Sequence, residues 1–125
     1  MVASQLETTM DSINSLPALA KTWLLDGPLA THVAAYAANL ERGSYSRQTS
    51  RSHCEALAHF AHWMVRCTLT ADQLDEDCVK QFLDFHLPSC DCHCSALRNH
   101  NELRAGLGLL LEVLRDQRVI AELLP

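Results

Sequence analysis

The chain has 125 residues, of which 48% are hydrophobic and 20% charged, and its formal net charge at pH 7 is −5. This length predicts one domain with a single core, and the apolar fraction excludes an intrinsically disordered or low-complexity protein. Taken over the whole chain, the negative charge argues against a protein that holds nucleic acid by bulk positive charge.

Targeting and redox signals favour a cytoplasmic protein. No run reaches the roughly 18–20 consecutive apolar residues of a membrane helix. The first ten residues contain Glu7 but no lysine or arginine, unlike a secretory signal. Six cysteines would suit a disulfide framework only in a secreted protein, so we expect free thiols and no membrane contact.

The hydrophobic spacing predicts helices and no β-strand alternation. An apolar patch from Leu16 to Leu25 predicts a short helix, and Gly27-Pro28 precedes a longer one that ends near Gly43. The apolar stripe of that longer helix recurs at i, i+3, i+4 and i+7, at Val33, Tyr36, Ala37 and Leu40.

Three further helices are expected after Gly43. Ser46 is a candidate N-cap for a helix that reaches about Arg66, with an apolar stripe of Cys54, Leu57, Phe60, Ala61 and Met64. Thr70 and Gln73 form a weak capping box for the next helix, whose apolar face is Val79, Phe82, Leu83 and His86 and which we expect Pro88 to end. After a loop from Pro88 to Leu97, the last helix runs from about Arg98 to Gln117, with Gly106 and Gly108 in its interior. The predicted fold class is all-α, a bundle of four or five helices.

The charge is unevenly distributed along these helices. The segment 42–66 carries net +3, from Arg42, Arg47, Arg51 and Arg66 against Glu55. The segment 72–91 carries net −5, from Asp72, Asp75, Glu76, Asp77, Asp84 and Asp91 against Lys80. The net charge of −5 is therefore compatible with a basic surface on the helices at 46–66 and 98–117.

Two groups of polar side chains at the starts of these helices are candidate DNA-binding residues. They are Arg47, Gln48, Thr49 and Arg51 in the first group, and Arg98, His100, Asn101 and Arg104 in the second. Arginine, glutamine and asparagine read base edges, and arginine and threonine also hold phosphates, which helix N-termini attract. The alternative is that both groups are simply solvated helix faces.

A cluster of zinc-type ligands follows the third predicted long helix. His86, Cys90, Cys92, His93 and Cys94 lie within nine positions, and zinc prefers tetrahedral cysteine and histidine sets. We take His86, Cys90, Cys92 and Cys94 as a candidate structural zinc site. The spacing lacks a second Cys-x-x-Cys pair, so the alternative is a reduced loop with His86 packed on its helix.

The helix that starts after Ser46 resembles the N-terminal core-binding (SAM-like) domain of tyrosine recombinases, the phage- and transposon-type integrases. The resemblance rests on Ser46 and Thr49 at the helix start and on Leu57, Phe60 and Trp63 along it, with His53 where the family usually has tyrosine. It extends from about Leu29 to Leu124. It implies a four- to five-helix SAM-like bundle whose two basic helix starts face double-stranded DNA in a nucleoid-associated, prokaryotic-type protein.

The resemblance also implies a division of labour between domains. Residues 1–27 would be an N-terminal extension with a short helix, residues 28–121 the core-binding domain, and residues 122–125 the start of an interdomain linker. The family's catalytic tyrosine belongs to a second domain, and neither Tyr36 nor Tyr45 stands in a catalytic motif. We therefore expect this chain to bind the recombination site without being an enzyme. Other recombinase protomers would be its protein partners, with no required cofactor and no small-molecule substrate.

Two other functions remain open at the level of sequence. A helical protein–protein adaptor is one, since SAM-like bundles also serve in oligomerisation. A zinc-stabilised regulatory fragment that competes with the full-length recombinase for its site is the other.

Overall fold

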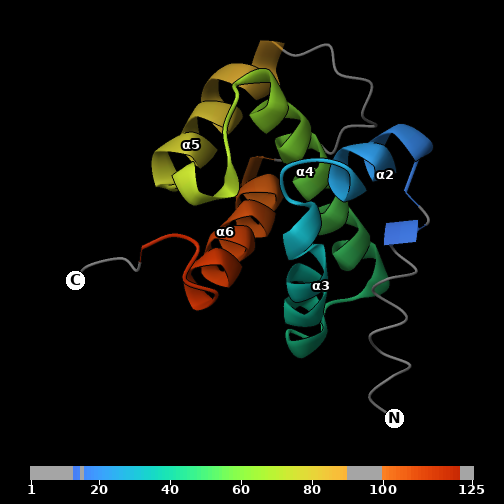
Figure 1. Cartoon of the computed structure of the whole chain (residues 1–125). Helices are drawn as coiled ribbons and strands as arrows, with labels where there is room; N and C mark the ends of the chain where they lie inside the picture. Colours follow the sequence, from blue (N-terminus) through green and yellow to red (C-terminus); the bar gives the residue numbers. More distant parts are fainter. Residues whose placement is uncertain (1–12, 15, 90–99, 122–125) are drawn as a thin grey trace.

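The computed structural model describes residues 13, 14, 16–89 and 100–121 (Figure 1). This part of the chain is all-α, as predicted, and contains five α-helices and no strand. The helices are α2 (Ala18–Leu25), α3 (Val33–Arg42), α4 (Arg47–Arg66), α5 (Glu76–Gln81) and α6 (His100–Asp116). Short turns of other helical types lie between them, namely η1 (Ala30–His32), η2 (Ala71–Gln73), η3 (Phe82–His86) and η4 (Leu87–Ser89).

Helix α4 is the centre of the fold, with α2 packed against one side and α6 against another (Figure 1). It starts where the sequence predicts, because the Ser46 hydroxyl accepts a hydrogen bond from the backbone N–H of Thr49 at 3.1 Å. Its predicted stripe is completely buried, at Cys54, Leu57, Phe60, Ala61 and Met64. This 20-residue helix therefore supplies the largest share of the core.

Helix α3 begins later than the position of Pro28 suggests. The chain turns tightly at Gly27, where a Cβ atom would lie only 2.3 Å from the carbonyl oxygen of Trp23. The turn η1 then leads into α3 at Val33. The predicted stripe is buried, and the Tyr36 hydroxyl donates a hydrogen bond of 2.8 Å to the Gly106 carbonyl of α6.

The prediction of a single helix between Thr70 and Pro88 is wrong in its detail, because the structure has several shorter helical segments there. The predicted capping box exists, but it closes the turn η2, and a second cap follows at Asp75, whose carboxylate accepts from the N–H of Cys78 at 3.0 Å. Helix α5 then widens into a π-helical turn, η3, before Pro88 enters η4. Pro88 fits inside η4 because the first turn of a helix needs no N–H donor.

The described part of the last predicted helix is α6, and its leucines face inward. Leu103, Leu107, Leu110, Leu111 and Leu114 are all buried. Gly106 lies where α6 crosses α4, and a Cβ atom there would be 3.0 Å from Nδ1 of His53. Gly106 thus permits the close approach of the two helices, whereas a Cβ atom at Gly108 would have nothing within 4 Å.

Two histidines of α4, His59 and His62, pack against aromatic rings of other elements. His59 is 3% exposed, because Phe82 of η3 packs edge-on against its ring at 5.1 Å. His62 is partly buried, and its ring stacks on Trp23 of α2 at 4.0 Å. Both are covered by elements distant in sequence.

None of the helices in the described ranges is long and apolar enough to cross a membrane. Residues Ile13, Leu16, Ala20 and Leu24 belong to the same apolar core as α3, α4 and α6. The proposed boundary between residues 27 and 28 stays a prediction.

Candidate nucleic-acid interface

The first two turns of α4 present the first predicted group to solvent. Arg47, Gln48 and Arg51 are exposed, and Thr49 is half-buried. The Thr49 hydroxyl accepts a 2.9 Å hydrogen bond from Ser46, so this threonine is tied into the helix cap. The structure therefore exposes Arg47, Gln48 and Arg51 at the start of a helix that the Ser46 side chain caps.

Arg51 carries one competing contact, with Glu55 one turn further along α4. The Nε atom of Arg51 lies 3.3 Å from the Glu55 carboxylate, and the arginine side chain is 48% exposed. An exposed pair of this kind contributes about 0–1 kcal/mol, so a phosphate can compete for the guanidinium. The ion pair holds Arg51 on the outer face of α4 without removing it from reach.

Arg42 adds a third exposed arginine close in sequence to Arg47 and Arg51, and we call these three residues the basic end. Arg42 was not among the candidate residues. It is the exposed last residue of α3, and only the Gly43–Ser46 loop separates it from Arg47. The loop is compact, because Ser44 adopts a positive φ of 54° and the Tyr45 ring lies over Gly43. The segment charge of +3, which includes Arg42, could have indicated this residue as a candidate.

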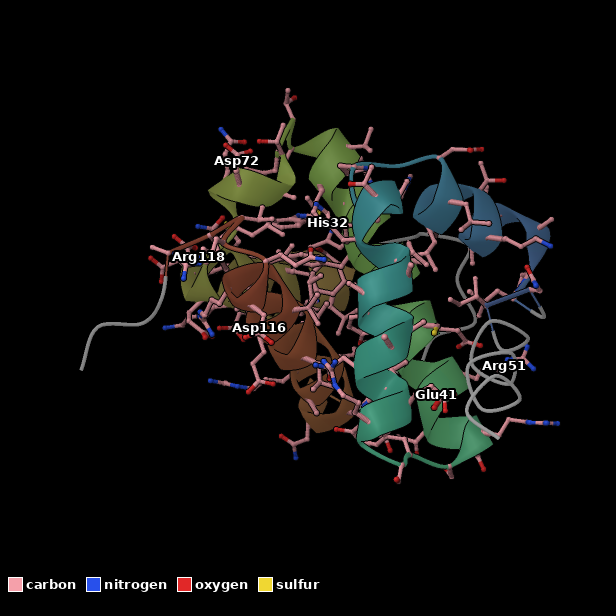
Figure 2. All side chains as sticks on the ribbon, turned by 60° about the horizontal axis from the view of Figure 1, so that its bottom comes forward. His32, Glu41, Arg51, Asp72, Asp116 and Arg118 are labelled. Carbon is pink, nitrogen blue, oxygen red and sulfur yellow. The ribbon has the colours of Figure 1, made fainter. Side chains whose placement is uncertain are left out.

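The second predicted group is only partly described. Arg98 lies outside the described residues, and His100 begins α6 without a described side chain. Asn101 and Arg104 are exposed on the first turns of α6. The contact of His53 with Gly106 brings these turns against the N-terminal half of α4, so both predicted helix starts belong to one end of the bundle (Figure 2).

Arg104 has a different neighbourhood from the arginines of α4. It lines a cleft of about 230 Å³ together with Glu76, Asp77 and Asp84, which come from α5 and η3. Lys80 lines the same cleft, but the three carboxylates outnumber the two basic side chains, so the local potential opposes a phosphate beside Arg104. The α4 group is therefore the stronger candidate of the two.

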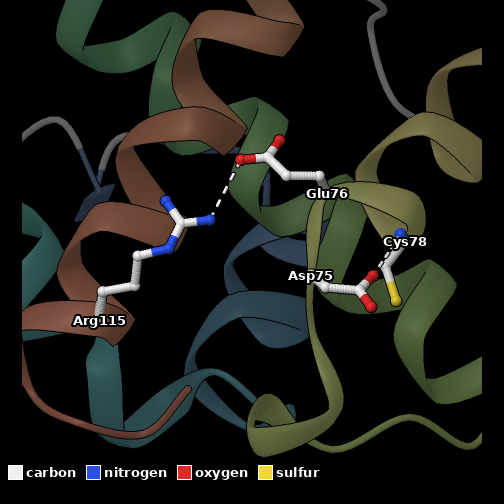
Figure 3. A network of polar contacts seen from close by, with 4 residues as sticks. All are labelled: Asp75, Glu76, Cys78 and Arg115. Atoms are coloured by element: carbon white, nitrogen blue, oxygen red, sulfur yellow. Dashed lines mark hydrogen bonds and ion pairs between the residues drawn. The ribbon is translucent and has the colours of Figure 1, made fainter. Parts of the chain in front are cut away.

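The acidic residues form a separate face around α5. Arg115 of α6 reaches across to Glu76 with an N–O distance of 3.1 Å, and Asp75 caps α5 (Figure 3). Figure 2 shows Asp72 at the upper left and Arg51 at the lower right of the same view. The acidic segment and the start of α4 are thus separated in space, although Glu41 lies on the side of Arg51 and Arg118 on the side of Asp72.

The predicted zinc set lies mostly outside the described residues, which include His86 but not Cys90, Cys92 or Cys94. The His86 ring stacks on Phe82 at 5.4 Å, and burial together with nearby Arg66 and His62 lowers its pKa. Within the described ranges no three histidine, cysteine or acidic side chains are grouped so that they could hold a metal. The zinc site stays a prediction.

Comparisons of the chain with protein-family models, with curated proteins and with solved structures find no match.

Proposed function

We propose that this chain is a DNA-binding helical module that holds duplex DNA with the end of the bundle formed by α3, α4 and α6. The observation that carries the proposal is the exposed basic end formed by Arg42, Arg47 and Arg51. Around it, Gln48 and Asn101 supply the amide groups that read adenine edges.

The start of α4 suits a phosphate for two reasons besides its arginines. The first N–H groups of a helix have no partner within the helix, and Ser46 satisfies that of Thr49. The N–H groups of Arg47 and Gln48 remain directed toward the same end, where the helix dipole favours an anion. Two guanidinium groups and a helix N-terminus therefore act on one short stretch of the DNA backbone.

The finer proposal is that the module belongs to a tyrosine recombinase or integrase of the SAM-like, core-binding type. Leu57, Phe60 and Trp63, which carry the resemblance, are buried as inward-packing residues of such a helix should be. Tyr36 is buried and donates its hydroxyl hydrogen to Gly106, which makes it unsuitable as a nucleophile. In this proposal cleavage and rejoining belong to a separate catalytic domain, and this chain provides the grip on the site.

A protein–protein adaptor is the second candidate, favoured by one observation. Phe85 is 73% exposed and Val65 is 59% exposed, which is unusual for an aromatic and a branched apolar side chain. An adaptor would self-associate or bind protein without any requirement for Arg47 or Arg51.

Fluorescence anisotropy with a labelled DNA duplex, measured over a series of salt concentrations, tests the proposal. Replacing both Arg47 and Arg51 with glutamine removes two phosphate contacts, so the negative slope of log K against log salt should become shallower by about 1.8. A matched control replaces Lys80 and Arg118 with glutamine, which changes the net charge equally away from α4.

The control should bind as the unmodified protein does. Equal weakening in both double variants would indicate whole-surface attraction and contradict the assignment of α4. Absence of any salt-sensitive binding by the unmodified protein would leave the adaptor as the better explanation.

A further inference from the structure

His53 is a buried histidine at the junction of three helices. It lies on α4, it is 5% exposed, and its Nδ1 atom is buried with no hydrogen-bond partner among the described residues. A neutral imidazole can leave one ring nitrogen as an unused acceptor at modest cost. A protonated imidazole would place a charge and an unpaired donor in the same position, at a much larger cost.

The surroundings of His53 leave little space for a second partner. Gly106 of α6 lies so close that a Cβ atom there would be 3.0 Å from Nδ1 and 3.5 Å from the Tyr36 hydroxyl. The Tyr45 ring packs edge-on against the imidazole at 5.4 Å. The Gly43–Ser46 loop and α6 thus contact this side chain of α4, and Tyr36 of α3 lies beside the same glycine of α6.

The titratable groups that face this junction give a protonated His53 little compensation. Tyr36 on α3 and Cys54 on α4 stay neutral, because burial raises the pKa of the Tyr36 hydroxyl and raises that of the Cys54 thiol to about 12. Tyr45 faces it from the loop, and Glu102 faces it from α6. Burial lowers the pKa of His53, and this effect is larger than the opposing effect of Glu102.

We propose that His53 is a proton-sensitive latch, which closes the junction of α3, α4 and α6 when its imidazole is neutral and opens it when protonated. Opening would loosen the first turns of α6 from α4. This inference concerns the conformation of the bundle and does not depend on the proposed binding of DNA.

The sign of the pH effect follows from linkage. Because the pKa of His53 is lower in the closed bundle than in an opened one, the opened state binds more protons. The junction is therefore fully closed above the ordinary histidine pKa of about 6.5 and is progressively destabilised as pH falls below it. One proton changes the opening equilibrium by at most about tenfold per pH unit.

Amide hydrogen exchange followed by NMR, between pH 7.5 and pH 5.5, tests the latch. After correction for intrinsic exchange, protection of the Leu103–Leu107 amides should fall by up to about tenfold per pH unit below pH 6.5. In His53→Phe and His53→Leu, which cannot take up the proton, this fall should disappear. His62→Gln is the matched control, because it removes another α4 histidine of lowered pKa outside the junction and should leave the fall in place.

An undiminished fall in both His53 variants, or no fall in the unmodified protein, would overturn the proposal. If neither variant folds, the histidine signals of the unmodified protein decide the question. His53 must then titrate below 6.5 in step with the loss of Leu103–Leu107 protection, and titration without that loss would also refute the latch.

Discussion

The paired substitutions Gly106→Ala and Gly108→Ala test the close crossing of α6 over α4. Both glycines lie inside the same helix, and neither has a positive φ, so alanine suits the backbone at both positions. They differ in their surroundings. A Cβ atom at Gly108 meets nothing within 4 Å, whereas one at Gly106 meets Nδ1 of His53 at 3.0 Å and Cγ at 3.4 Å.

The expected magnitudes follow from two opposing effects. Replacing glycine by alanine inside a helix contributes about 0.8–1 kcal/mol of stability, so Gly108→Ala should stabilise the protein by about that amount. At Gly106 the same gain is offset by overpacking, which costs about 1–3 kcal/mol. His53 cannot easily move away, because it is 5% exposed and the Tyr45 ring packs against it. Gly106→Ala should therefore be neutral to destabilising by about 2 kcal/mol.

Urea unfolding followed by circular dichroism measures the difference directly. The two variants should differ by about 1–3 kcal/mol in the free energy of unfolding, with Gly108→Ala the more stable. Equal stabilisation in both would mean that the α4–α6 approach is looser than described, and the argument for a closed junction around His53 would fail with it.

Three further predictions concern single side chains. Ser46→Ala should lower the free energy of unfolding by about 1 kcal/mol, because the N–H of Thr49 loses its cap, and an unchanged urea midpoint would contradict the cap. Tyr36→Phe removes the buried 2.8 Å hydrogen bond to Gly106 and should cost about 1 kcal/mol in the same assay, so full native stability would show that this bond contributes nothing. At pH 8 a thiol with a pKa of about 12 is ionised in only about one molecule in 10⁴, so iodoacetamide should leave Cys54 unmodified while it alkylates exposed Cys67. Peptide mapping by mass spectrometry would refute the burial of Cys54 if both were alkylated at similar rates.

The parts of the fold that the sequence predicts are those governed by local periodicity and capping. The stripes of α3, α4 and α6 are regular, and each is buried at the positions that the spacing indicates. Ser46 can be identified as an N-cap because its partner, Thr49, is three residues away. Such signals depend on neighbours within one or two turns, which a single sequence contains.

The segment between Thr70 and Pro88 could not be predicted in the same way. The capping box at Thr70 is correct, but the second cap at Asp75 interrupts the helix that the apolar spacing suggests. The π-helical turn at Phe82–His86 packs Phe82 against Phe60 at 5.2 Å and against His59 at 5.1 Å. These are contacts with α4, so the hydrogen-bond pattern there depends on tertiary packing.

In the candidate site, too, some features follow from local sequence and others from tertiary packing. Arg47 and Arg51 are exposed because they lie in the first two turns of α4, at the helix start that the cap residue Ser46 marks in the sequence. The acidic neighbours of Arg104 come from α5 and η3, and no spacing within α6 indicates them. The orphaned nitrogen of His53 likewise arises from three segments that meet only in the folded chain.

We propose that duplex DNA binds at the end of the bundle formed by α3, α4 and α6. A chemical-shift map of ¹⁵N-labelled protein titrated with a short duplex at low salt tests it most directly. The perturbed amides should cluster at Arg42, Gly43–Ser46, Arg47–Arg51 and the first turns of α6, and those of α5 should stay unchanged. Perturbations centred on α5 and on Phe85, or no perturbation at any duplex concentration, would contradict it.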